Sequence, residues 1–422
     1  MGKEYLRRVA DGMVKECLEM AGAVLIEGPK WCGKTRTAEE FAKSALYITS
    51  ESRIKSLKKA AESGARGFLN GDAPRLIDEW QEVPEIWDAV RFEVDHRGER
   101  GQFILTGSSV PQKDSTRHSG AGRVARVAMR PMSLFESGES NGAISLKGLF
   151  EGNVAGDGGS SSLSLEGLAR AIARGGWPES LEDPADKDPK AASWYLDAVI
   201  GSDLSRVDGV NRKPGTSRRI IESIARNLST GASMEAIRTD ANGTDGKMTG
   251  VTLKSYIDAM EAVFLLENLP AWNPHLRSRT KLASSGKWHF ADPSIALAAL
   301  GGTKDALLGD MRAFGFFFES LCVRDLRVYA QPLGGRVGHL RNKNGFEVDL
   351  IVELPDGRWG AAEVKLGASE EDRAAENLLK LRDMIDDGRM RQPSFLMILT
   401  AGAYGYRRRD GVLVVPIGCL RD

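Results

Sequence analysis

The sequence predicts a multi-domain α/β protein, and three observations support this fold class. The chain has 422 residues, more than one ordinary hydrophobic core accommodates, so about two to four domains are expected. A short apolar run at 23–26 leads into a glycine-rich loop, and a helix-compatible run follows at 36–42. Further short apolar runs at 45–49 and 102–109 have the length and composition of buried strands.

The composition is that of a soluble globular protein, with 41% hydrophobic and 27% charged residues. The formal net charge is zero, so contact with nucleic acid or a membrane surface would have to come from local patches. No apolar run has the length of a signal peptide or of a bilayer span. The cysteines lack C-x-x-C spacing, which argues against a zinc site or a disulfide framework; they are Cys17, Cys32, Cys322 and Cys419. We therefore expect a cytoplasmic protein without membrane contact.

The first element is a predicted amphipathic helix, because apolar residues recur at spacings of three and four between residues 4 and 20. A strand and then the loop GPKWCGKT, Gly28 to Thr35, follow, and the loop fits the pattern G-x-x-x-x-G-K-[ST]. Gly28 and Gly33 let the backbone approach an anion without a Cβ in the way, so that N–H groups can point at phosphate oxygens. The next helix adds its positive N-terminal end.

This loop predicts a site for ATP and Mg²⁺. Lys34 would bridge the β- and γ-phosphates, and the Thr35 hydroxyl would bind Mg²⁺. The required strand and helix flank the loop, which disfavours a glycine turn with a chance lysine. The predicted nucleotide-binding residues are Gly28, Pro29, Lys30, Trp31, Cys32, Gly33, Lys34, Thr35 and Arg36.

An acidic pair, Asp78 and Glu79, follows the apolar residues Leu76 and Ile77. In open α/β sheets, ligands bind at the carboxyl edge of the strands, where this pair would stand. We expect Asp78 to hold Mg²⁺ through water, and Glu79 to act as the catalytic base that polarises the water attacking the γ-phosphate.

Two further groups of residues are candidates for sensing or stabilising the γ-phosphate. Thr106 and Ser108 end the strand at 102–109 and would hydrogen-bond the attacking water or the phosphate; an ordinary turn explains them equally well. Arg123 and Arg126 flank a later strand, and either would serve as an arginine finger. Solvated arginines are the alternative.

Five segments together resemble a known family. They are GPKWCGKT at 28–35, RLIDEWQEVPEIWDAVR at 75–91, QFILTGSS at 102–109, AGRVARVAMRPMSLFE at 121–136 and ARGGWPE at 173–179. This order is similar to that of bacterial and archaeal ATPases of the AAA-type superfamily that carry a C-terminal domain called DUF4143. The resemblance implies a P-loop NTPase core of the ASCE class, a helical lid and a C-terminal domain of the restriction-endonuclease-like class.

The predicted boundaries follow composition and pattern. They are 1–145 for the ATPase core, 146–210 for a flexible insertion and lid, 211–290 for a winged-helix-like module and 291–422 for a nuclease-like domain. The insertion is rich in Gly, Ser and Asn.

The winged-helix module is predicted from three short helices and a strand-like run, with 252–262 as the recognition helix if DNA is read. Basic residues that would meet phosphates are Arg218, Arg219, Lys247, Lys254, Arg277, Arg279 and Lys281, with Trp272 among them. Nearby acids dilute this charge, so DNA contact and packing between domains both remain open.

A second candidate site lies in the last third of the chain. Asp349 falls in an alternating run, and Glu363 and Lys365 share one face of the next run after a Pro-Asp-Gly turn. Folded as a hairpin, these residues would converge, with Asp349 and Glu363 binding Mg²⁺ or Mn²⁺ and Lys365 orienting a metal-bound water. This resembles the PD-(D/E)xK nuclease core, in which Val348 here replaces the proline, and the resemblance adds Glu319 as an upstream acidic ligand.

Two interpretations of this site stay open beside cleavage. The acids and the lysine would merely pair in a surface hairpin, or the domain would bind nucleic acid without cutting it. Taken together, the sequence predicts an ATPase whose nucleotide state controls a nuclease-like domain acting on DNA or RNA. The alternative is a regulatory switch that binds a protein or DNA partner without cleavage. A third reading, a small-molecule kinase, leaves the last domain without a role. An arginine finger acting in trans would require an oligomer.

Overall fold

The computed structural model describes residues 4–109, 122–153, 159–182, 190–242, 248–273, 286–342, 345–385 and 390–422. The chain divides into two compact units. Unit 1 comprises Met1–Pro131, Ala198–Lys213 and Ser255–Leu265, and unit 2 comprises Met132–Asp197, Pro214–Lys254 and Leu266–Asp422. Among the described residues, no helix is both long and apolar enough to span a membrane.

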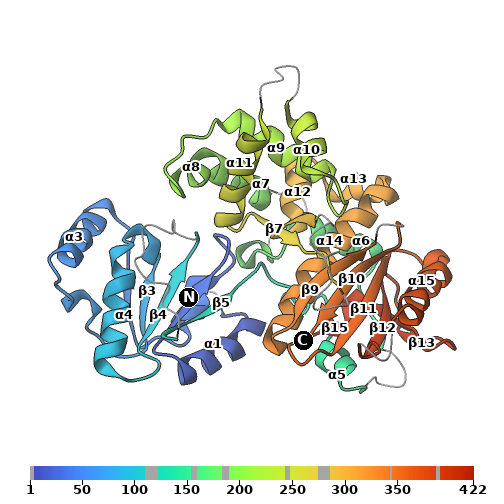
Figure 1. Ribbon diagram of the computed structural model, residues 1–422, viewed down its shortest axis with the longest axis horizontal. Coiled ribbons are helices and arrows are strands. Elements are labelled where there is room, and N and C mark those ends of the chain that lie inside the picture. Colours follow the sequence, from blue (N-terminus) through green and yellow to red (C-terminus); the bar gives the residue numbers. More distant parts are fainter. Residues whose placement is uncertain are drawn as a thin grey trace. The chain divides into compact units, whose positions relative to one another are not determined.

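Unit 1 is built on a five-stranded sheet in the order β2-β3-β4-β1-β5, in which every pairing is parallel (Figure 1). The strands are β1 (Ala23–Glu27), β2 (Ser44–Tyr47), β3 (Arg75–Asp78), β4 (Phe103–Gly107) and β5 (Val124–Ala128). Because β4 lies between β1 and β3, the carboxyl ends of these three strands meet at one edge. The predicted α/β class is confirmed, and this edge positions the candidate ATP site.

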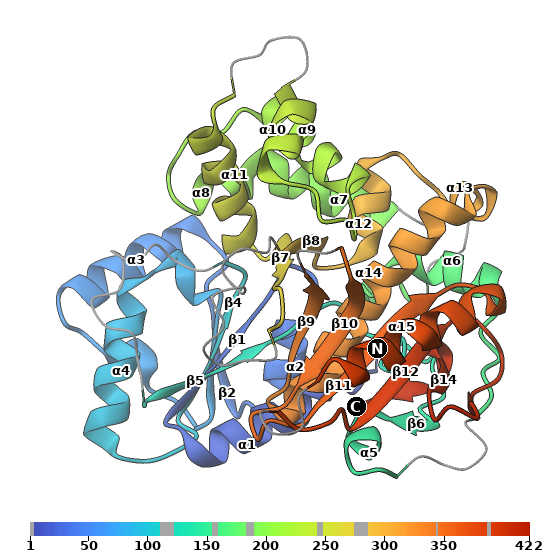
Figure 2. The ribbon, with the colours of Figure 1, turned by 45° about the vertical axis from the view of Figure 1, so that its right-hand side comes forward.

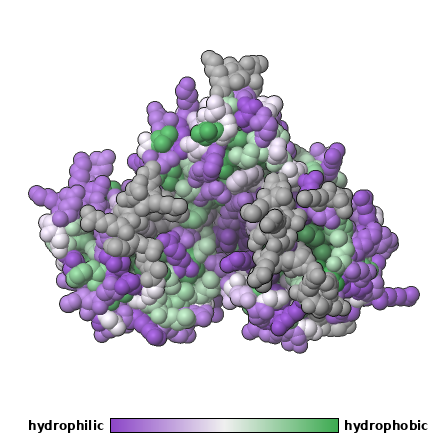
Figure 3. All heavy atoms as spheres, in the orientation of Figure 1, coloured by the Kyte–Doolittle hydropathy of each residue, from purple (hydrophilic) through white to green (hydrophobic). Residues whose placement is uncertain are grey.

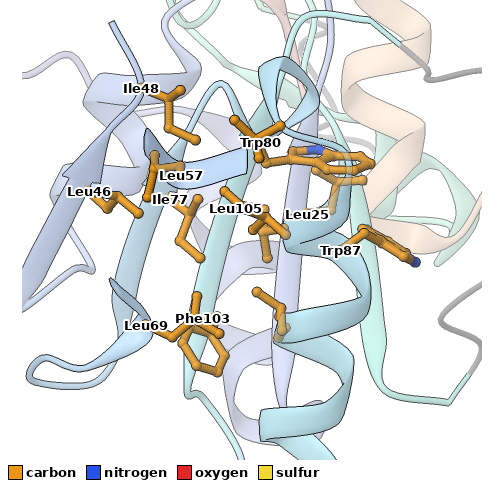
Figure 4. Close-up of a cluster of buried hydrophobic side chains, with 14 of the residues drawn as sticks. Leu25, Leu46, Ile48, Leu57, Leu69, Ile77, Trp80, Trp87, Phe103 and Leu105 are labelled. Atoms are coloured by element: carbon orange, nitrogen blue, oxygen red, sulfur yellow. The ribbon is translucent and has the colours of Figure 1, made fainter. Parts of the chain in front are cut away.

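Helices cover both faces of this sheet, which explains why its strands are continuous apolar runs. Leu25 packs into a core cluster with residues of α4, whereas its neighbour Val24 packs into a second cluster with residues of α1 and α2. Figure 4 shows the first cluster, in which Trp80 and Trp87 lie with ring centroids 4.9 Å apart. The helices are α1 (Val9–Met20), α2 (Lys34–Glu39), α3 (Glu51–Glu62) and α4 (Glu85–Arg97), with 3-10 turns η1 (Gly67–Leu69) and η2 (Trp80–Glu82).

The outer surface of unit 1 is polar where α3 lies. Only Leu57 of this helix is buried, and Figure 3 shows hydrophilic side chains over it. This exposed face gives α3 the pattern of a one-sided amphipathic helix.

Two later segments of the chain complete unit 1. The first contains the π-helix η5 (Val199–Asp203) and the short α8 (Leu204–Arg206), and the second contains most of α11 (Gly250–Ala262). Arg212 is buried and joins the two segments, because its guanidinium donates to the backbone oxygens of Leu204 and Ser255, 2.6 and 3.0 Å away. It also pairs with Asp208.

Unit 2 contains a six-stranded mixed sheet in the order β13-β14-β12-β11-β10-β9 (Figure 2). The strands are β9 (Arg336–Arg341), β10 (Glu347–Glu353), β11 (Trp359–Lys365), β12 (Phe395–Thr400), β13 (Tyr406–Arg407) and β14 (Leu413–Pro416). Strands β9, β10 and β11 are antiparallel neighbours, whereas β11, β12 and β14 run parallel. Helix α15 (Glu371–Asp383) packs on the sheet through Ala374, Leu378 and Leu381, and α14 (Met311–Ala330) contacts β9, β10 and β11.

A buried charge cluster joins the start of unit 2 to α14. Arg324 is 3% exposed and pairs with Asp292 and Asp325, each at 2.7 Å. Asp325 also accepts from the Leu134 amide at 3.1 Å. Because a buried charge is costly without partners, these contacts fix the segment that follows residue 131 against the long helix.

The remaining elements of unit 2 are mostly helical. They are β6 (Ile144–Ser145), α5 (Leu146–Phe150), α6 (Leu165–Arg174), η3 (Pro178–Ser180), α7 (Lys190–Ala198), α9 (Pro214–Arg226), α10 (Met234–Asn242), β7 (Leu266–Leu269), β8 (Lys287–Phe290), α12 (Pro293–Ala299), α13 (Lys304–Gly309), η8 (Gln331–Leu333), η9 (Ala368–Glu370), η10 (Ile417–Cys419) and β15 (Leu420–Arg421).

Part of the segment expected to be flexible has regular structure. β6 pairs in parallel with β15, and α5 buries Leu146, Leu149 and Phe150. The high Gly and Ser content of the segment gave no indication of this structure. The few apolar residues of α5 are nevertheless buried and hold the segment in place.

The three helices predicted for the winged-helix module are α9, α10 and α11, and the β7–β8 hairpin follows. The winged-helix assignment and the predicted domain boundaries remain predictions.

Candidate functional site

The phosphate loop adopts a conformation that only its glycines allow. Gly28 has φ of 156°, and a Cβ at this position would lie 2.0 Å from the Met129 carbonyl oxygen. Gly33 has φ of 101° and directly precedes α2, which begins at Lys34. The loop therefore ends on a helix N-terminus, as an anion site of this kind requires.

Side chains within the loop are held by the protein's own oxygens. Lys34 is 4% exposed, and its ammonium donates to the carbonyls of Gly28 and Pro29 at 3.0 and 2.8 Å. Cys32 is buried in the sheet core, and Trp31 is 49% exposed. Of the predicted binding residues, Arg36 pairs on the surface with Glu39 at 2.9 Å.

Arg8 braces this loop from outside and was missed in the sequence analysis. Its guanidinium donates to the carbonyl oxygens of Cys32 and Arg130, each at 2.7 Å, and the side chain is buried. No local pattern identifies this role, because the contacts span 24 and 122 residues of sequence.

The acidic pair meets the loop at the sheet edge. The Thr35 hydroxyl donates to Asp78 Oδ1 at 2.7 Å, and the buried Thr106 hydroxyl donates to the same oxygen at 2.6 Å. The structure describes no group of three or more His, Cys, Asp or Glu side chains that would hold a metal ion by itself. A hydroxyl and a carboxylate in contact are nevertheless hard oxygen donors that fit Mg²⁺, which takes its other ligands from phosphate and water.

Glu79 sits in a strained position beside this pair. Its φ is 58°, in the left-handed region that non-glycine residues rarely occupy. The Glu79 backbone amide donates to the Thr106 hydroxyl at 3.1 Å. The Glu79 carboxylate accepts from Ser108 Oγ at 2.9 Å and from the Gln81 side-chain amide. Thr106 and Ser108, the two predicted sensors, therefore both contact the acidic pair.

The two candidate arginine fingers are engaged elsewhere. Arg123 pairs with Asp95 at 2.5 Å, and Arg126 pairs with Glu27 at 2.8 Å. Burial raises the pKa of Glu27, and the charge of Arg126 opposes that rise. Both arginines are about half exposed, so the finger role remains a prediction.

A cavity of about 540 Å³ opens within unit 1 next to the loop. Its lining includes Lys30 of the loop, Gln81 and Ser108 of the Glu79 network, and Asp203 and Arg206 of the segment 198–213. Lys30 Nζ lies 2.7 Å from Asp203 Oδ1.

The second candidate site has the predicted convergence on adjacent strands of unit 2. Lys365 Nζ lies 3.2 Å from Asp349 Oδ2 and 2.9 Å from Glu363 Oε2. Asp349 Oδ2 also accepts from the Val364 amide at 2.9 Å, and Asn377 donates to Glu363 Oε1 at 2.7 Å. Carboxylate oxygens are hard donors of the kind that divalent cations prefer, and here both carboxylates contact the Lys365 ammonium.

Burial raises the pKa of Glu363 to about 7, and the charge of Asp349 acts in the same direction. Burial lowers the pKa of Lys365, but the two carboxylates outweigh it and raise the pKa. Lys365 is therefore protonated, and it places a positive charge between the two carboxylates.

Glu319 lies at this site but contacts a different lysine. Lys287, on β8, is 3% exposed and pairs with Glu319 at 3.0 Å and Glu347 at 2.8 Å. Burial raises the pKa of Glu319 to about 8, the charge of Asp349 adds to the rise, and Lys287 opposes it. Sequence analysis missed Lys287, because it comes from a hairpin outside the nuclease-like pattern.

The basic residues considered for DNA contact are partly engaged. Arg218 pairs with Asp197 at 2.6 Å, and Arg219 donates to the Ala241 carbonyl at 3.1 Å. Trp272 is buried against Trp359, with ring centroids 4.9 Å apart, whereas Lys254 is exposed. Lys247, Arg277, Arg279 and Lys281 lie outside the described residues.

Comparison with family models divides the chain into three matched regions. Residues 21–137 match an AAA domain, residues 165–306 match a domain of unknown function, DUF8612, and residues 314–420 match a domain of unknown function, DUF4143. The AAA match contains the phosphate loop and the acidic pair, and the DUF4143 match contains Glu319, Asp349, Glu363 and Lys365. The predicted AAA and DUF4143 assignments are confirmed.

Two similar proteins are the uncharacterized protein Rv2008c of Mycobacterium tuberculosis and the uncharacterized protein Mb2031c of Mycobacterium bovis. Each is 25% identical over 423 residues, which covers 97% of this chain and 83% of the relative. Among solved structures, a Walker-type ATPase of Pyrococcus abyssi is 14% identical, with a TM-score of 0.41 over 70% of this chain and 96% of that one. A Signal Transduction ATPase with Numerous Domains from Pyrococcus horikoshii is 13% identical, with a TM-score of 0.26 over 76% and 48%.

Proposed function

We propose that this chain, an AAA-type P-loop ATPase with a DUF4143 domain, uses its nucleotide state to control a metal-dependent, nuclease-like site in unit 2. One observation carries the proposal: Asp349, Glu363 and Lys365 converge on adjacent strands of the same chain that bears a complete phosphate loop. Nucleic acid, DNA or RNA, is the proposed substrate class.

At the proposed ATP site, different residues would bind the phosphates, hold Mg²⁺ and accept a proton. Lys34 would exchange its contacts with the Gly28 and Pro29 carbonyls for the phosphates of ATP. Thr35 and Asp78 would hold Mg²⁺, which when bound would supply positive charge next to the phosphates. Glu79 would accept the proton of the attacking water, with its carboxylate oriented by Ser108 and Gln81.

At the second site, Asp349 and Glu363 would hold a divalent cation, which when bound would lower the pKa of a water that is to attack a phosphodiester. Asn377 fixes the Glu363 carboxylate, and the Val364 amide fixes that of Asp349. Lys365 would orient the water and stabilise charge on the phosphate. The order α14, β9, β10, β11, α15, β12 supports a nuclease-like fold for this region.

The proposed coupling between the two sites would act through helices that run from one unit into the other. Helix α7 of unit 2 continues into the π-helix η5 of unit 1, and α11 begins in unit 2 and ends in unit 1. A nucleotide-dependent change in the segment 198–213 would therefore act on helices that both units share. Such coupling requires contacts that differ between the ATP and ADP states.

A cleavage and binding assay tests this proposal. Purified protein is incubated with single- and double-stranded DNA and RNA, with Mg²⁺ or Mn²⁺, and with ATP, ADP or no nucleotide. We expect metal-dependent cleavage that Asp349→Asn abolishes while ATP hydrolysis continues. Glu79→Gln, which should bind ATP without turnover, should hold cleavage at the level of the ATP state. Asp356→Asn, in the exposed β10–β11 turn, is the matched control and should cut like wild type.

Cleavage that survives in Asp349→Asn would contradict the assignment of the site. Lys34→Ala should lose nucleotide binding, and normal ATP hydrolysis by Glu79→Gln would remove Glu79 as the base.

A regulatory switch without cleavage is the second candidate function, and one observation favours it. Lys365 and Lys287 already pair with the carboxylates of the second site, so each acid has a partner without metal. This candidate predicts nucleotide-dependent binding of a protein or DNA partner. Calorimetry that detects no Mn²⁺ or Mg²⁺ site dependent on Glu363 would favour it over cleavage.

A further inference from the structure

The phosphate loop of unit 1 carries an ion pair that its sequence pattern does not require. Lys30 is the second residue after Gly28, and its ammonium lies 2.7 Å from Asp203 Oδ1. The lysine side chain is 39% exposed, whereas that of Asp203 is 9% exposed. The pair thus has one partner that can move into solvent and one that the fold holds in place.

Asp203 is fixed by an unusual local structure. It is the last residue of the π-helix η5, and its Oδ1 also accepts from the Ser202 hydroxyl at 3.0 Å. π-Helical turns are rare and occur frequently at functional sites. The Ser202 hydroxyl and the Lys30 ammonium thus contact the same carboxylate oxygen of Asp203.

The pair lies on the side of the loop where the terminal phosphate of ATP is expected. Lys30 and Asp203 line the same cavity as Gln81 and Ser108. Both of these residues hydrogen-bond Glu79, the proposed base for the water that attacks the γ-phosphate. A γ-phosphate in this cavity would lie near Lys30 and would be repelled by the Asp203 carboxylate.

We propose that Asp203 is a positioning residue that competes with the γ-phosphate of ATP for Lys30. Without nucleotide, Asp203 holds Lys30 and so ties the segment 198–213 to the phosphate loop. ATP takes Lys30 from Asp203 and loosens this tie, whereas ADP, which lacks the γ-phosphate, leaves it in place. This inference rests on the proposed ATPase function and identifies the segment through which nucleotide state is read.

The consequence for the chain follows from connectivity. The segment 198–213 is continuous with α7 before it and α9 after it, and both helices belong to unit 2. Release of Asp203 would therefore remove the contact with the phosphate loop from the stretch of unit 1 that directly joins two helices of unit 2, while the Arg212 contacts of that stretch remain.

The test compares ATP and ADP affinity in the full chain, by fluorescence titration with a non-hydrolysable ATP analogue and with ADP. Asp203→Asn removes the charge and keeps an acceptor for Ser202. We expect it to tighten binding of the analogue about tenfold while ADP affinity changes less than about twofold, within the usual range of coupling between sites. Asp203→Glu should restore the wild-type ratio of the two affinities. Asp240→Asn is the matched control, because Asp240 forms a pair of similar length with Arg226 on the surface of unit 2.

A second measurement covers the case in which Asp203→Asn alters folding. Hydrogen exchange of residues 199–209 should rise in wild type when the analogue binds and should stay low with ADP. In Lys30→Gln, exchange should be high without nucleotide. An unchanged ratio of affinities in Asp203→Asn, or equal weakening of both ligands, overturns this inference alone. If wild type binds no ATP analogue, the proposed ATPase function fails with it.

Discussion

Replacing Thr106 by valine should damage both the stability and the chemistry of unit 1, because its hydroxyl serves both residues of the acidic pair. Thr106 is fully buried; it donates to Asp78 at 2.6 Å and accepts from the Glu79 amide at 3.1 Å. Valine has nearly the same shape but offers neither bond. The Glu79 amide would then lose its partner at a residue whose φ of 58° already strains the backbone.

The magnitude follows from these two contacts. A hydrogen bond to a charged group contributes about 1.5–3 kcal/mol, and a buried N–H left without a partner costs about 1–3 kcal/mol. Because the effects of neighbouring groups do not add fully, we expect Thr106→Val to lower the free energy of unfolding by about 3 kcal/mol. For a domain of this size, that loss lowers Tm by roughly 6–12 °C.

Catalysis should fall as well, since Asp78 Oδ1 accepts from both Thr106 and Thr35. A carboxylate that has lost one of these bonds would position Mg²⁺ less well, and misplacement of a catalytic group by about 1 Å can cost about 100-fold in rate. The assay is urea unfolding together with steady-state ATP hydrolysis at several Mg²⁺ concentrations. Thr106→Ser is the control, because it keeps the hydroxyl and should lose only about 1 kcal/mol for the buried methyl group. If Thr106→Val unfolds and hydrolyses ATP like Thr106→Ser, the hydroxyl neither stabilises unit 1 nor positions Asp78.

Two other substitutions test features of each unit. Gly28→Ala should abolish ATP binding and destabilise unit 1 by about 1–3 kcal/mol, because its Cβ would meet the Met129 carbonyl oxygen at 2.0 Å; Gly12→Ala, with no atom within 4 Å of its Cβ, should be neutral or slightly stabilising in the same thermal unfolding and nucleotide titrations. Glu319 has a pKa raised from 4.5 to about 8, so the folded state binds a proton that the unfolded state has released, and metal-free protein should lose stability as the pH rises from about 5 to 8. Glu319→Gln should reduce that loss in melting curves recorded with EDTA across this pH range, and an unchanged pH dependence would contradict the assigned shift.

The fold around the phosphate loop could be predicted because its signals are local. Leu25 and Val24 are adjacent in sequence and pack into opposite faces of the sheet, and this burial on both sides produces the continuous apolar run. The prediction of where helix α1 begins was less accurate. The apolar spacing extends back to Leu6, but Leu6 is 43% exposed and the helix begins at Val9, where Asp11 accepts from the Arg8 amide. The capping contact between Asp11 and the Arg8 amide marks the start of the helix, and the spacing of apolar residues gives no information about such a contact.

The contacts of the candidate sites differ in how far the sequence predicts them, because some are local and others join distant parts of the chain. Asp349, Glu363 and Lys365 lie on two strands joined by a short turn, so register alone brings them together. Lys287 reaches Glu319 from another hairpin, and Asp203 reaches Lys30 across 173 residues of sequence. Neither contact leaves a periodic or spacing signal, because only the tertiary fold determines which distant side chains become neighbours.

The lysine contacts at both candidate sites share one physical cause, and it bears on how the sites would bind ligands. The lysines predicted to bind phosphate, or to pair with acids predicted to bind metal, are partly removed from water. A charge in such a place costs folding free energy unless it has a partner. In this chain, Lys34 bonds loop carbonyls, Lys30 bonds Asp203, and Lys365 bonds Asp349 and Glu363. A ligand at either proposed site would therefore displace an internal partner, so its measured affinity would be the difference between two sets of contacts. Asp203 belongs to the segment 198–213, which continues into unit 2, so under our proposal ATP binding would change the conformational equilibrium of this segment.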